Sequence, residues 1–515
     1  MDDQRSSVPA QLTSIRQDCL FPFWHPSGER IYFIADTALW VVAAAGGQPE
    51  RLVEHAVGAT ISPDGQTLVL ARVEDGTALW TATPDGKALS RRSNYTTAEP
   101  AVAVTLRFSR NGQMLGLKSG LTTTVLYLAN YPLSSGKFPD QMIPFQVPIG
   151  SASLRSFDWM PDNRHVVLSV TSGVLSSTLW IGDILTKAVE PLSSSESLNF
   201  APSVSADGLR VAFTSTALNW DIEQIDLRTF AVTPLVASAR YDCWPAWTPS
   251  DKQLAFSTTR TGRPEIWLKS LRGNREGPII GPEDFPAEST QILAQPAVSP
   301  NGRSIAYQRF DASGATQIYI SPVSGGKPIQ LAPSDFRQDY PAWSPDGNWI
   351  AFTTLIHSQT MPQRVVQKAR PGGAAAPVHI AYGPEASPSI GLKWSRSGDI
   401  LYVSSKGLAV TNEAGSGSRT ILEPEPLVFD WSPDGSLVYA IRKTPQRHME
   451  FFTLDPKTSQ IRVLADLGPK PVSPDPYGNP YTIRTLAISP DGTRAAFSYL
   501  QPDSKIWMLE AIKTP

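Results

Sequence analysis

Apolar and polar positions alternate along this chain in short runs of strand length, and the runs recur at a nearly regular interval. An apolar residue stands before each of eleven short polar turns, from Trp24 to Ile488. After each turn comes a run rich in β-branched and aromatic residues, such as RIYFI, TLVLA or WIAFT. Runs of this kind between turn residues predict β-strands, so each turn is expected to join the two strands of a hairpin.

The turns share a four-residue pattern whose commonest form is SPDG. The fourth position is Gly in nine copies and otherwise Asn163 or Asp251, which predicts left-handed backbone there. Pro in eight copies suits the φ at the start of a type I turn, and a first-position Ser or Thr is able to bond the turn backbone. The copies are HPSG (25–28), SPDG (62–65), SRNG (109–112), MPDN (160–163), SADG (205–208), TPSD (248–251), SPNG (299–302), SPDG (344–347), SRSG (395–398), SPDG (432–435) and SPDG (489–492).

Each repeat contains more than one hairpin. A third strand-like run follows the second in LWVV (39–42), LWTA (79–82), LWIG (179–182) and IWLK (266–269), and a weaker fourth run is expected after it. The copies are spaced by 37 to 57 residues, the length of a four-stranded propeller blade. The sequence therefore predicts an all-β protein of tandem β-propellers, built from about eleven four-stranded blades.

The order of these strands resembles the TolB-like β-propeller repeat family, which is related to WD40-like propellers. The clearest copies are CWPAWTPSDKQLAFSTTRTGRPEIWLKSL (243–271) and DYPAWSPDGNWIAF (339–352), and the resemblance extends from about residue 11 to residue 509. TolB itself carries a leading α/β domain that this sequence does not show. Prolyl-oligopeptidase-like enzymes add a hydrolase domain with a G-x-S-x-G elbow, which is also missing from this sequence. The resemblance implies the fold and leaves the function open.

Eleven blades exceed the usual ring of four to eight, so two rings are expected. The loosest junction, 272–295, predicts a first propeller at 1–285 with about six blades and a second at 286–515 with about five. The last repeat lacks a fourth strand, and QLTSIRQDCLFPFW (11–24) parallels QLAPSDFRQDYPAW (330–343). We therefore expect residues 11–14 to complete the last blade and so to close the second ring, although a boundary at 131–150 is an alternative.

Composition and charge narrow the classes of partner. Hydrophobic residues make up 41% of the chain and charged residues 18%, with a net charge of −2, so no basic surface for nucleic acid is expected. No apolar run of membrane-spanning length and no signal peptide is found, which predicts a cytoplasmic protein, or a periplasmic one if the N-terminus is truncated or mis-assigned. Cys19 and Cys243 are too few for a disulfide framework.

Candidate catalytic groups do not gather in any motif. The histidines are scattered singly and show no metal-ligand spacing, so no metal, cofactor or catalytic residue is predicted. The aspartates of the SPDG turns repeat with the turn, which favours a structural role for them. The histidines are His25, His55, His165, His357, His379 and His448.

Eleven of the fourteen tryptophans fall on two repeating strand positions and are interpreted as blade packing, which leaves Trp220, Trp244 and Trp349. In a propeller, the loop between the second and third strands opens on the same face as the linker from the previous blade. An Arg, Trp and Tyr cluster on that face has the composition of an interface hot spot. The predicted binding residues are Trp220, Arg240, Tyr241, Trp244, Arg260 and Arg263.

An alternative interpretation of this cluster is that Arg260 follows the usual loop pattern and that Trp244 packs between blades. The leading functional hypothesis is a non-enzymatic scaffold that binds a protein or peptide. A second is the sensor or scaffold part of a larger bacterial transcriptional regulator or kinase. A third is a hydrolase or lyase with a site in the propeller channel.

Overall fold

The computed structural model is built almost entirely of strands and forms two compact units. The first unit comprises residues 1–216 and 504–515, and the second comprises 217–503. Among the described residues, helical structure is limited to the 3₁₀ turn η1 (Pro282–Asp284). The structure describes residues 12, 19–74, 76–95, 104–119, 125–132, 143–146, 153–171, 177–193, 197–238, 240–273, 275–285, 290–311, 315–357, 362–372, 376–382, 391–445, 448–469, 483–510 and 512.

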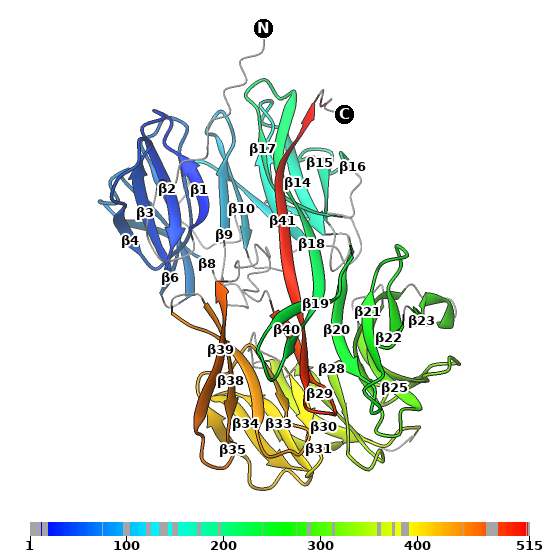
Figure 1. The fold of residues 1–515 in the computed structure, drawn as a ribbon. Helices are drawn as coiled ribbons and strands as arrows, with labels where there is room; N and C mark the ends of the chain where they lie inside the picture. The colour runs from blue at the N-terminus through cyan, green and yellow to red at the C-terminus, as the bar shows by residue number, and fades with distance from the viewer. Residues whose placement is uncertain are drawn as a thin grey trace. The chain divides into compact units, whose positions relative to one another are not determined.

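In the first unit, four-stranded antiparallel blades follow one another along the chain (Figure 1). Their innermost strands β1, β5, β9, β13 and β17 contact one another in chain order. The strands are β1 (Leu20–Trp24), β2 (Arg30–Ala35), β3 (Ala38–Ala43) and β4 (Glu50–Glu54); β5 (Ala56–Ile61), β6 (Leu68–Glu74), β7 (Gly76–Ala82) and β8 (Ser90–Tyr95); β9 (Val104–Phe108), β10 (Met114–Ser119), β11 (Val125–Asn130) and β12 (Ile143–Gln146); β13 (Leu154–Trp159), β14 (His165–Thr171), β15 (Ser177–Asp183), β16 (Val189–Pro191) and β17 (Leu198–Val204).

In the second unit, the innermost strands form a closed ring. β20, β24, β28, β32, β36 and β40 each contact the next, and β40 also contacts β20. The strands are β19 (Val232–Val236), β20 (Asp242–Trp247), β21 (Gln253–Thr258), β22 (Glu265–Ser270) and β23 (Glu276–Ile280); β24 (Thr290–Val298), β25 (Ser304–Asp311), β26 (Thr316–Pro322) and β27 (Ile329–Gln330); β28 (Arg337–Trp343), β29 (Ile350–His357), β30 (Pro362–Ala369) and β31 (Val378–Tyr382); β32 (Leu392–Trp394), β33 (Asp399–Ser404), β34 (Gly407–Asn412) and β35 (Arg419–Leu422); β36 (Val428–Trp431), β37 (Val438–Lys443), β38 (His448–Leu454), β39 (Ile461–Pro469) and β40 (Ile483–Ile488).

Two long strands, β18 (Arg210–Asp226) and β41 (Arg494–Glu510), carry the chain from one unit to the other. They are hydrogen-bonded neighbours and lie side by side in Figure 1. Leu227 N donates to Thr493 O at 2.9 Å, and Ile512 N donates to Leu209 O at 3.1 Å, so the strands run antiparallel. Each corresponds in sequence to the second and third strands of one repeat, with the hairpin between them opened into a straight strand.

This exchange decides how the last blade is completed. In the second unit, β40 and the first half of β41 pair with the second half of β18, and β19 follows as the fourth strand. The third and fourth strands of the last blade therefore come from the fifth repeat, whereas the third strand was expected from the last repeat and the fourth from residues 11–14. Of that predicted segment, residues 11, 13 and 14 lie outside the described residues.

The predicted boundary at residue 285 falls inside the second unit. Phe285 packs in one apolar core with Ile266 on β22 and with Tyr307 on β25. Its ring centroid lies 5.2 Å from that of Tyr319, in an edge-to-face contact. This core joins the blades on both sides of 272–295, so residue 285 lies within one ring. Within the described residues, three four-stranded sheets belong to the first unit and five to the second, and a further sheet of nine strands has strands in both, so the division into six and five blades stays a prediction.

The SPDG turns adopt the predicted backbone. Gly347 has φ +72°, and Asn163 and Asp251 both have φ +58° at the equivalent position. Ser344 Oγ donates to Asp346 Oδ1 at 2.6 Å, and that oxygen also accepts Asn348 N at 3.0 Å. The aspartate therefore fixes the turn, and its carboxylate is engaged in local hydrogen bonds.

The core lies between successive blades, and the tryptophan before each turn helps to join them. Trp247 Nε1 donates to Ala487 O at 2.9 Å, and Trp343 Nε1 donates to Ala297 O at 2.9 Å. Trp159 and Trp431 make the same bond to the blade before them. Trp159, Trp247, Trp343 and Trp431 therefore pack between blades as predicted, whereas Trp24 and Trp507, which were assigned to the same role, are each 57% exposed.

The turn aspartates predict a loss of stability in acid. Hydrogen bonds from the turn serines lower the pKa of Asp346 and of Asp434 to about 2, from an ordinary value of 3.8. Because the folded-state pKa is the lower one, the stability that these groups contribute is present above about pH 4 and is lost as the pH falls toward 2. Asn111 and Asn301 already make the same turn bonds without a titrating group. We expect Asp346→Asn/Asp434→Asn to flatten the decline of the thermal midpoint between pH 4 and pH 2, and an unchanged decline would contradict this account.

The exchanged strand makes a second prediction. Ile225 on β18 is fully buried in a core with Val428 and Phe451 of the second unit, and its cross-strand partner Val232 on β19 is 37% exposed. Ile225→Ala should cost about 2–5 kcal/mol through the cavity it leaves, whereas Val232→Ala should be nearly neutral. In hydrogen exchange, the Ile225 variant should lose protection in β36–β38. Loss in β13–β15 with β36–β38 unaffected would show that β18 closes the first ring instead.

Candidate functional site

The six predicted binding residues lie in the second unit, around the junction between the last blade and the blade β20–β23. Trp220 is on β18, and Trp244 is on β20. Arg260 and Arg263 are in the loop between β21 and β22, and Arg240 is in the linker from β19 to β20. We call the side that carries these linkers and loops the linker face.

The three aromatic residues of the set form a buried row. Trp220, Tyr241 and Trp244 are 2%, 4% and 7% exposed. The Tyr241 ring centroid lies 6.4 Å from that of Trp220 and 5.6 Å from that of Trp244. The guanidinium carbon of Arg484 on β40 lies 4.6 Å from the centroid of the Trp220 ring. These aromatics join two blades where the ring closes, and they present little surface to a partner.

Trp244 occupies a backbone position that recurs around the ring. It has φ +56° at a bulge in the innermost strand, and its backbone N donates to Ser498 Oγ at 2.8 Å. Gln295, Tyr340 and Thr485 have φ of +53°, +58° and +54° at the equivalent bulges. Trp244 therefore takes part in a repeated contact between blades, as the alternative sequence interpretation proposed. The third unassigned tryptophan, Trp349, lies between Lys368 and Arg370, at 4.9 and 4.5 Å from its ring centroid.

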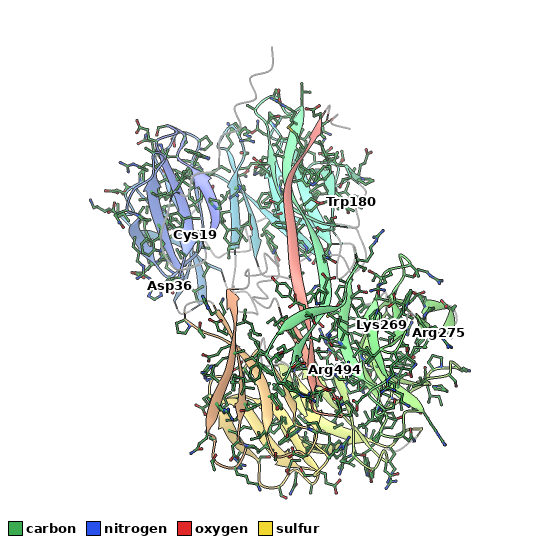
Figure 2. The ribbon with its side chains drawn as sticks, in the orientation of Figure 1. Cys19, Asp36, Trp180, Lys269, Arg275 and Arg494 are labelled. Carbon is green, nitrogen blue, oxygen red and sulfur yellow. The ribbon has the colours of Figure 1, made fainter. Side chains whose placement is uncertain are left out.

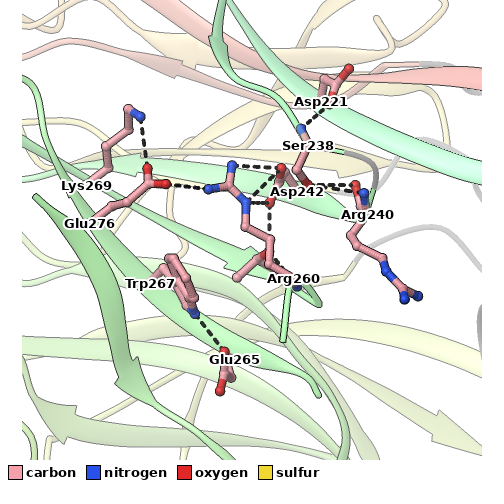
Figure 3. Close-up of polar contacts among 10 residues, drawn as sticks. Asp221, Ser238, Arg240, Asp242, Arg260, Glu265, Trp267, Lys269 and Glu276 are labelled. Atoms are coloured by element: carbon pink, nitrogen blue, oxygen red, sulfur yellow. Dashed lines mark hydrogen bonds and ion pairs between the residues drawn. The ribbon is translucent and has the colours of Figure 1, made fainter. Parts of the chain in front are cut away.

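Arg260 is the centre of an ion-pair network on the same blade (Figure 3). Its Nε lies 3.0 Å from Asp242 Oδ1, and its Nη1 lies 2.6 Å from Glu276 Oε1. Glu276 also accepts Lys269 Nζ at 2.9 Å, and Asp242 is fully buried. Figure 2 labels Lys269 on β22 and Arg275, which directly precedes β23. The network ties the innermost strand β20 to the outermost strand β23.

The stacking of Arg260 also recurs in other blades. Its guanidinium carbon lies 5.7 Å from the ring centroid of Trp267, a residue of the third strand. The same arrangement joins Arg72 to Trp80, Arg309 to Tyr319 and Arg442 to Phe452, at 4.6, 5.7 and 4.9 Å. Because similar contacts occur in several blades, Arg260 belongs to the architecture of the blade. An arginine 7 to 10 residues before the third-strand aromatic is a signal visible in the sequence.

The exposed part of the set consists of Arg240 and Arg263. Arg240 is exposed, and its guanidinium points away from Asp242 in Figure 3. The side chain of Arg263 is 55% exposed and lies 3.4 Å from Glu265 and 3.3 Å from Glu283. Two further exposed residues on this face were not predicted from the sequence: Phe336, which precedes β28 and is 37% exposed, and Arg337, the first residue of β28, whose side chain is 48% exposed. The sequence FRQDY (336–340) could have identified them, but its similarity to SIRQD (14–18) was interpreted only as evidence of repetition.

Burial raises the pKa of several ionisable groups behind the linker face. Burial raises the pKa of the Cys243 thiol, despite the nearby Arg484, and raises that of Tyr241 well above its usual value. Burial also raises the pKa of Asp221, with Asp242 as a like charge nearby. A thiol with a raised pKa carries little thiolate at neutral pH, so Cys243 is poorly suited to act as a nucleophile.

Two kinds of feature, metal-binding clusters and membrane-spanning helices, concern the part of the chain that the structure describes. There, no group of three or more His, Cys, Asp and Glu residues is arranged to hold a metal ion. The same residues include no helix long and apolar enough to cross a membrane.

Comparison with known proteins gives a partial sequence relative. No protein-family model matches the chain. A segment of 137 residues is 26% identical to tricorn protease homolog 1 of Streptomyces coelicolor, which amounts to 26% of this chain and 12% of that much longer relative.

Solved structures that resemble this one are TolB and other β-propeller proteins. A putative TolB from Agrobacterium tumefaciens is 17% identical with a TM-score of 0.41, and covers 56% of this chain and all of that one. The tricorn protease is 10% identical with a TM-score of 0.33, over 96% of this chain and 63% of that one. The fold class itself, all-β with tandem four-stranded blades, is confirmed by the sheets of this structure.

Two of the three arginines of the predicted set, Arg260 and Arg263, are expected to differ in their effect on stability. Arg260→Ala leaves the buried Asp242 carboxylate without its main partner, so it should destabilise the protein by about 3 kcal/mol. Arg263→Ala removes a half-exposed charge and should change stability by less than about 0.5 kcal/mol. Thermal denaturation of the two variants measures the difference. Equal midpoints would show that the network around Asp242 is not a stabilising element.

Proposed function

We propose that this chain is a non-enzymatic propeller scaffold that binds a protein or peptide on the linker face of its second unit. The observation that supports this most directly is the set of exposed side chains there. Arg240, Arg263 and Phe336 are in linkers or loops of that face, and Arg337 is the first residue of β28. Arginine and aromatic side chains are the types that dominate binding energy at protein interfaces.

The scaffold beneath these side chains is suited to hold them in place. Arg337 Nε lies 3.0 Å from Asp339 Oδ1, and its guanidinium carbon lies 5.6 Å from the centroid of the Phe310 ring. Asp339 is fully buried and is also held by Arg364 Nη1 at 2.8 Å. A guanidinium fixed on one side by a buried carboxylate loses little conformational entropy when its exposed edge meets a partner. Net positive side chains at the rim favour a partner with acidic residues.

A second candidate is the propeller part of a proteolytic assembly, which the match to tricorn protease homolog 1 favours. In this reading the chain would bind peptide substrates for a separate catalytic part. A peptidase assay on the purified chain tests the non-enzymatic proposal, because peptide cleavage would show that this chain itself is catalytic.

The proposal predicts that binding depends on the linker face. The double variant Arg240→Ala/Arg263→Ala should weaken capture of acidic peptides or protein partners at least tenfold, which corresponds to about 1.4 kcal/mol. A matched control, Lys252→Ala/Arg303→Ala, removes the same charge from exposed turn residues on the opposite side of the blades. Affinity measured by peptide array and confirmed by titration calorimetry should fall only in the first variant. Equal affinity for both variants would remove this face as the binding site.

A further inference from the structure

Arg337, the first residue of β28, keeps one edge of its guanidinium group exposed. It donates only through Nε, which lies 3.0 and 3.1 Å from the two carboxylate oxygens of Asp339. Its side chain is 48% exposed, and in the described part of the chain no hydrogen bond or ion pair engages Nη1 or Nη2. These two terminal nitrogens are therefore available to a ligand.

Two other arginines of the linker face lack such an edge. Arg260 donates through Nη1 to Glu276 at 2.6 Å and through Nη2 to Asp242 at 3.0 Å. Both terminal nitrogens of Arg263 also approach glutamate oxygens, at 3.3 and 3.4 Å. The terminal nitrogens of these two residues already meet carboxylates of the protein, whereas those of Arg337 are left for a carboxylate from outside.

The inner edge of Arg337 is held in place. Asp339 is fully buried, and Arg364 Nη1 and Gln308 Nε2 also donate to its carboxylate. The guanidinium carbon of Arg337 lies 5.6 Å from the centroid of the Phe310 ring. Because three donors fix the carboxylate, Arg337 is oriented before any ligand arrives. A planar fork that is already oriented loses little conformational entropy on binding.

Positive charge is in excess around this edge. The main charges that act on the Tyr340 hydroxyl are the carboxylate of Asp339 and the guanidinium groups of Arg364, Arg337 and Arg484. Burial and the Asp339 carboxylate nevertheless raise the pKa of Tyr340, so its hydroxyl is neutral at pH 7 and adds no negative charge. An anion that reaches this place meets three cations and one anion, which favours its binding.

We propose that the Nη1–Nη2 edge of Arg337 binds a carboxylate of the peptide or protein partner and is the anchor of the linker face. A guanidinium and a carboxylate pair through two parallel N–H···O bonds, which requires two free donors on one edge. A lysine would keep the charge and lose this fork. The inference rests on the proposed function, since it assigns the anchor within the face on which the partner would bind.

Peptide libraries test the anchor and the source of the carboxylate. Three sets of acetylated, arginine-free decapeptides are captured on immobilised full chain and counted by mass spectrometry. The first has one Glu and an amidated C-terminus, the second has Gln in its place, and the third is the Gln set with a free C-terminal carboxylate. Wild type should prefer the Glu set over the amidated Gln set about tenfold, and Arg337→Lys should remove this preference.

The matched control is Arg303→Lys, at an exposed arginine of the turn side, which should keep the preference. Preference for the free C-terminus that is lost in Arg337→Lys would support the site and assign a chain end as its source. If Arg337→Lys keeps the Glu preference while Arg240→Ala/Arg263→Ala loses it, the inference is overturned and the proposed function stands. If wild type captures no peptide from any set, both are overturned.

Chemical modification of wild-type protein gives a readout that does not depend on the folding of a variant. Phenylglyoxal reacts with the terminal nitrogens of accessible guanidinium groups, and peptide mapping measures the rate at each arginine. The Glu set should slow the modification of Arg337 about fivefold, because a bound carboxylate covers both nitrogens. Modification of Arg303 should keep its rate. Equal rates at Arg337 with the Glu set and with the amidated Gln set would contradict a carboxylate site there.

Discussion

The pairing of β18 with β41 is the interaction on which the rest of the structure depends. A propeller blade cannot leave its inner strands without partners, because their N–H and C=O groups are buried and an unpaired buried group costs about 1–3 kcal/mol. In the second unit the last blade obtains its outer strands from β18 and β19, and only with them do β20 and β40 meet to close the ring. The strand β18 begins in the first unit and ends in the second, and β41 runs the opposite way. Each unit therefore contains a strand segment that begins in the other unit.

The local parts of this architecture were predictable because local constraints determine them. A left-handed residue is required at the end of each turn, and only Gly, Asn or Asp adopts it at low cost, so Gly347, Asn163 and Asp251 all mark turns. The period of these turns then sets the size of the blade. The opened hairpins were not predictable in this way. NWDIEQID reads as the third strand of its own repeat, and nothing in its residues shows that it pairs with β41 instead of folding back.

The same limit applies to the candidate site. Arg, Trp and Tyr are chosen at interfaces between proteins for the reasons that make them useful between blades: large area, stacking and a polar group at the rim. From composition alone, Trp220 beside Arg484 cannot be told from an exposed hot spot, although the structure places it at 2% exposure. Arg240 and Arg263 were found by placing them in a linker and a loop, which is topological information. Phe336 and Arg337 were missed because their linker was interpreted as a repeat.

Repetition itself offers a way to separate the two roles. A contact that recurs in several blades, such as that of Arg72, Arg260, Arg309 and Arg442 with third-strand aromatics, serves a need common to these blades. The turn side of each blade is uniform for the same reason, since its aspartates and serines are bonded within the turns. Recognition of one partner requires residues that differ from blade to blade, and in the second unit these lie on the linker face. The contrast between repeated anchors such as Arg260 and unrepeated neighbours such as Arg240 is therefore a better guide to function than the density of aromatic and basic residues.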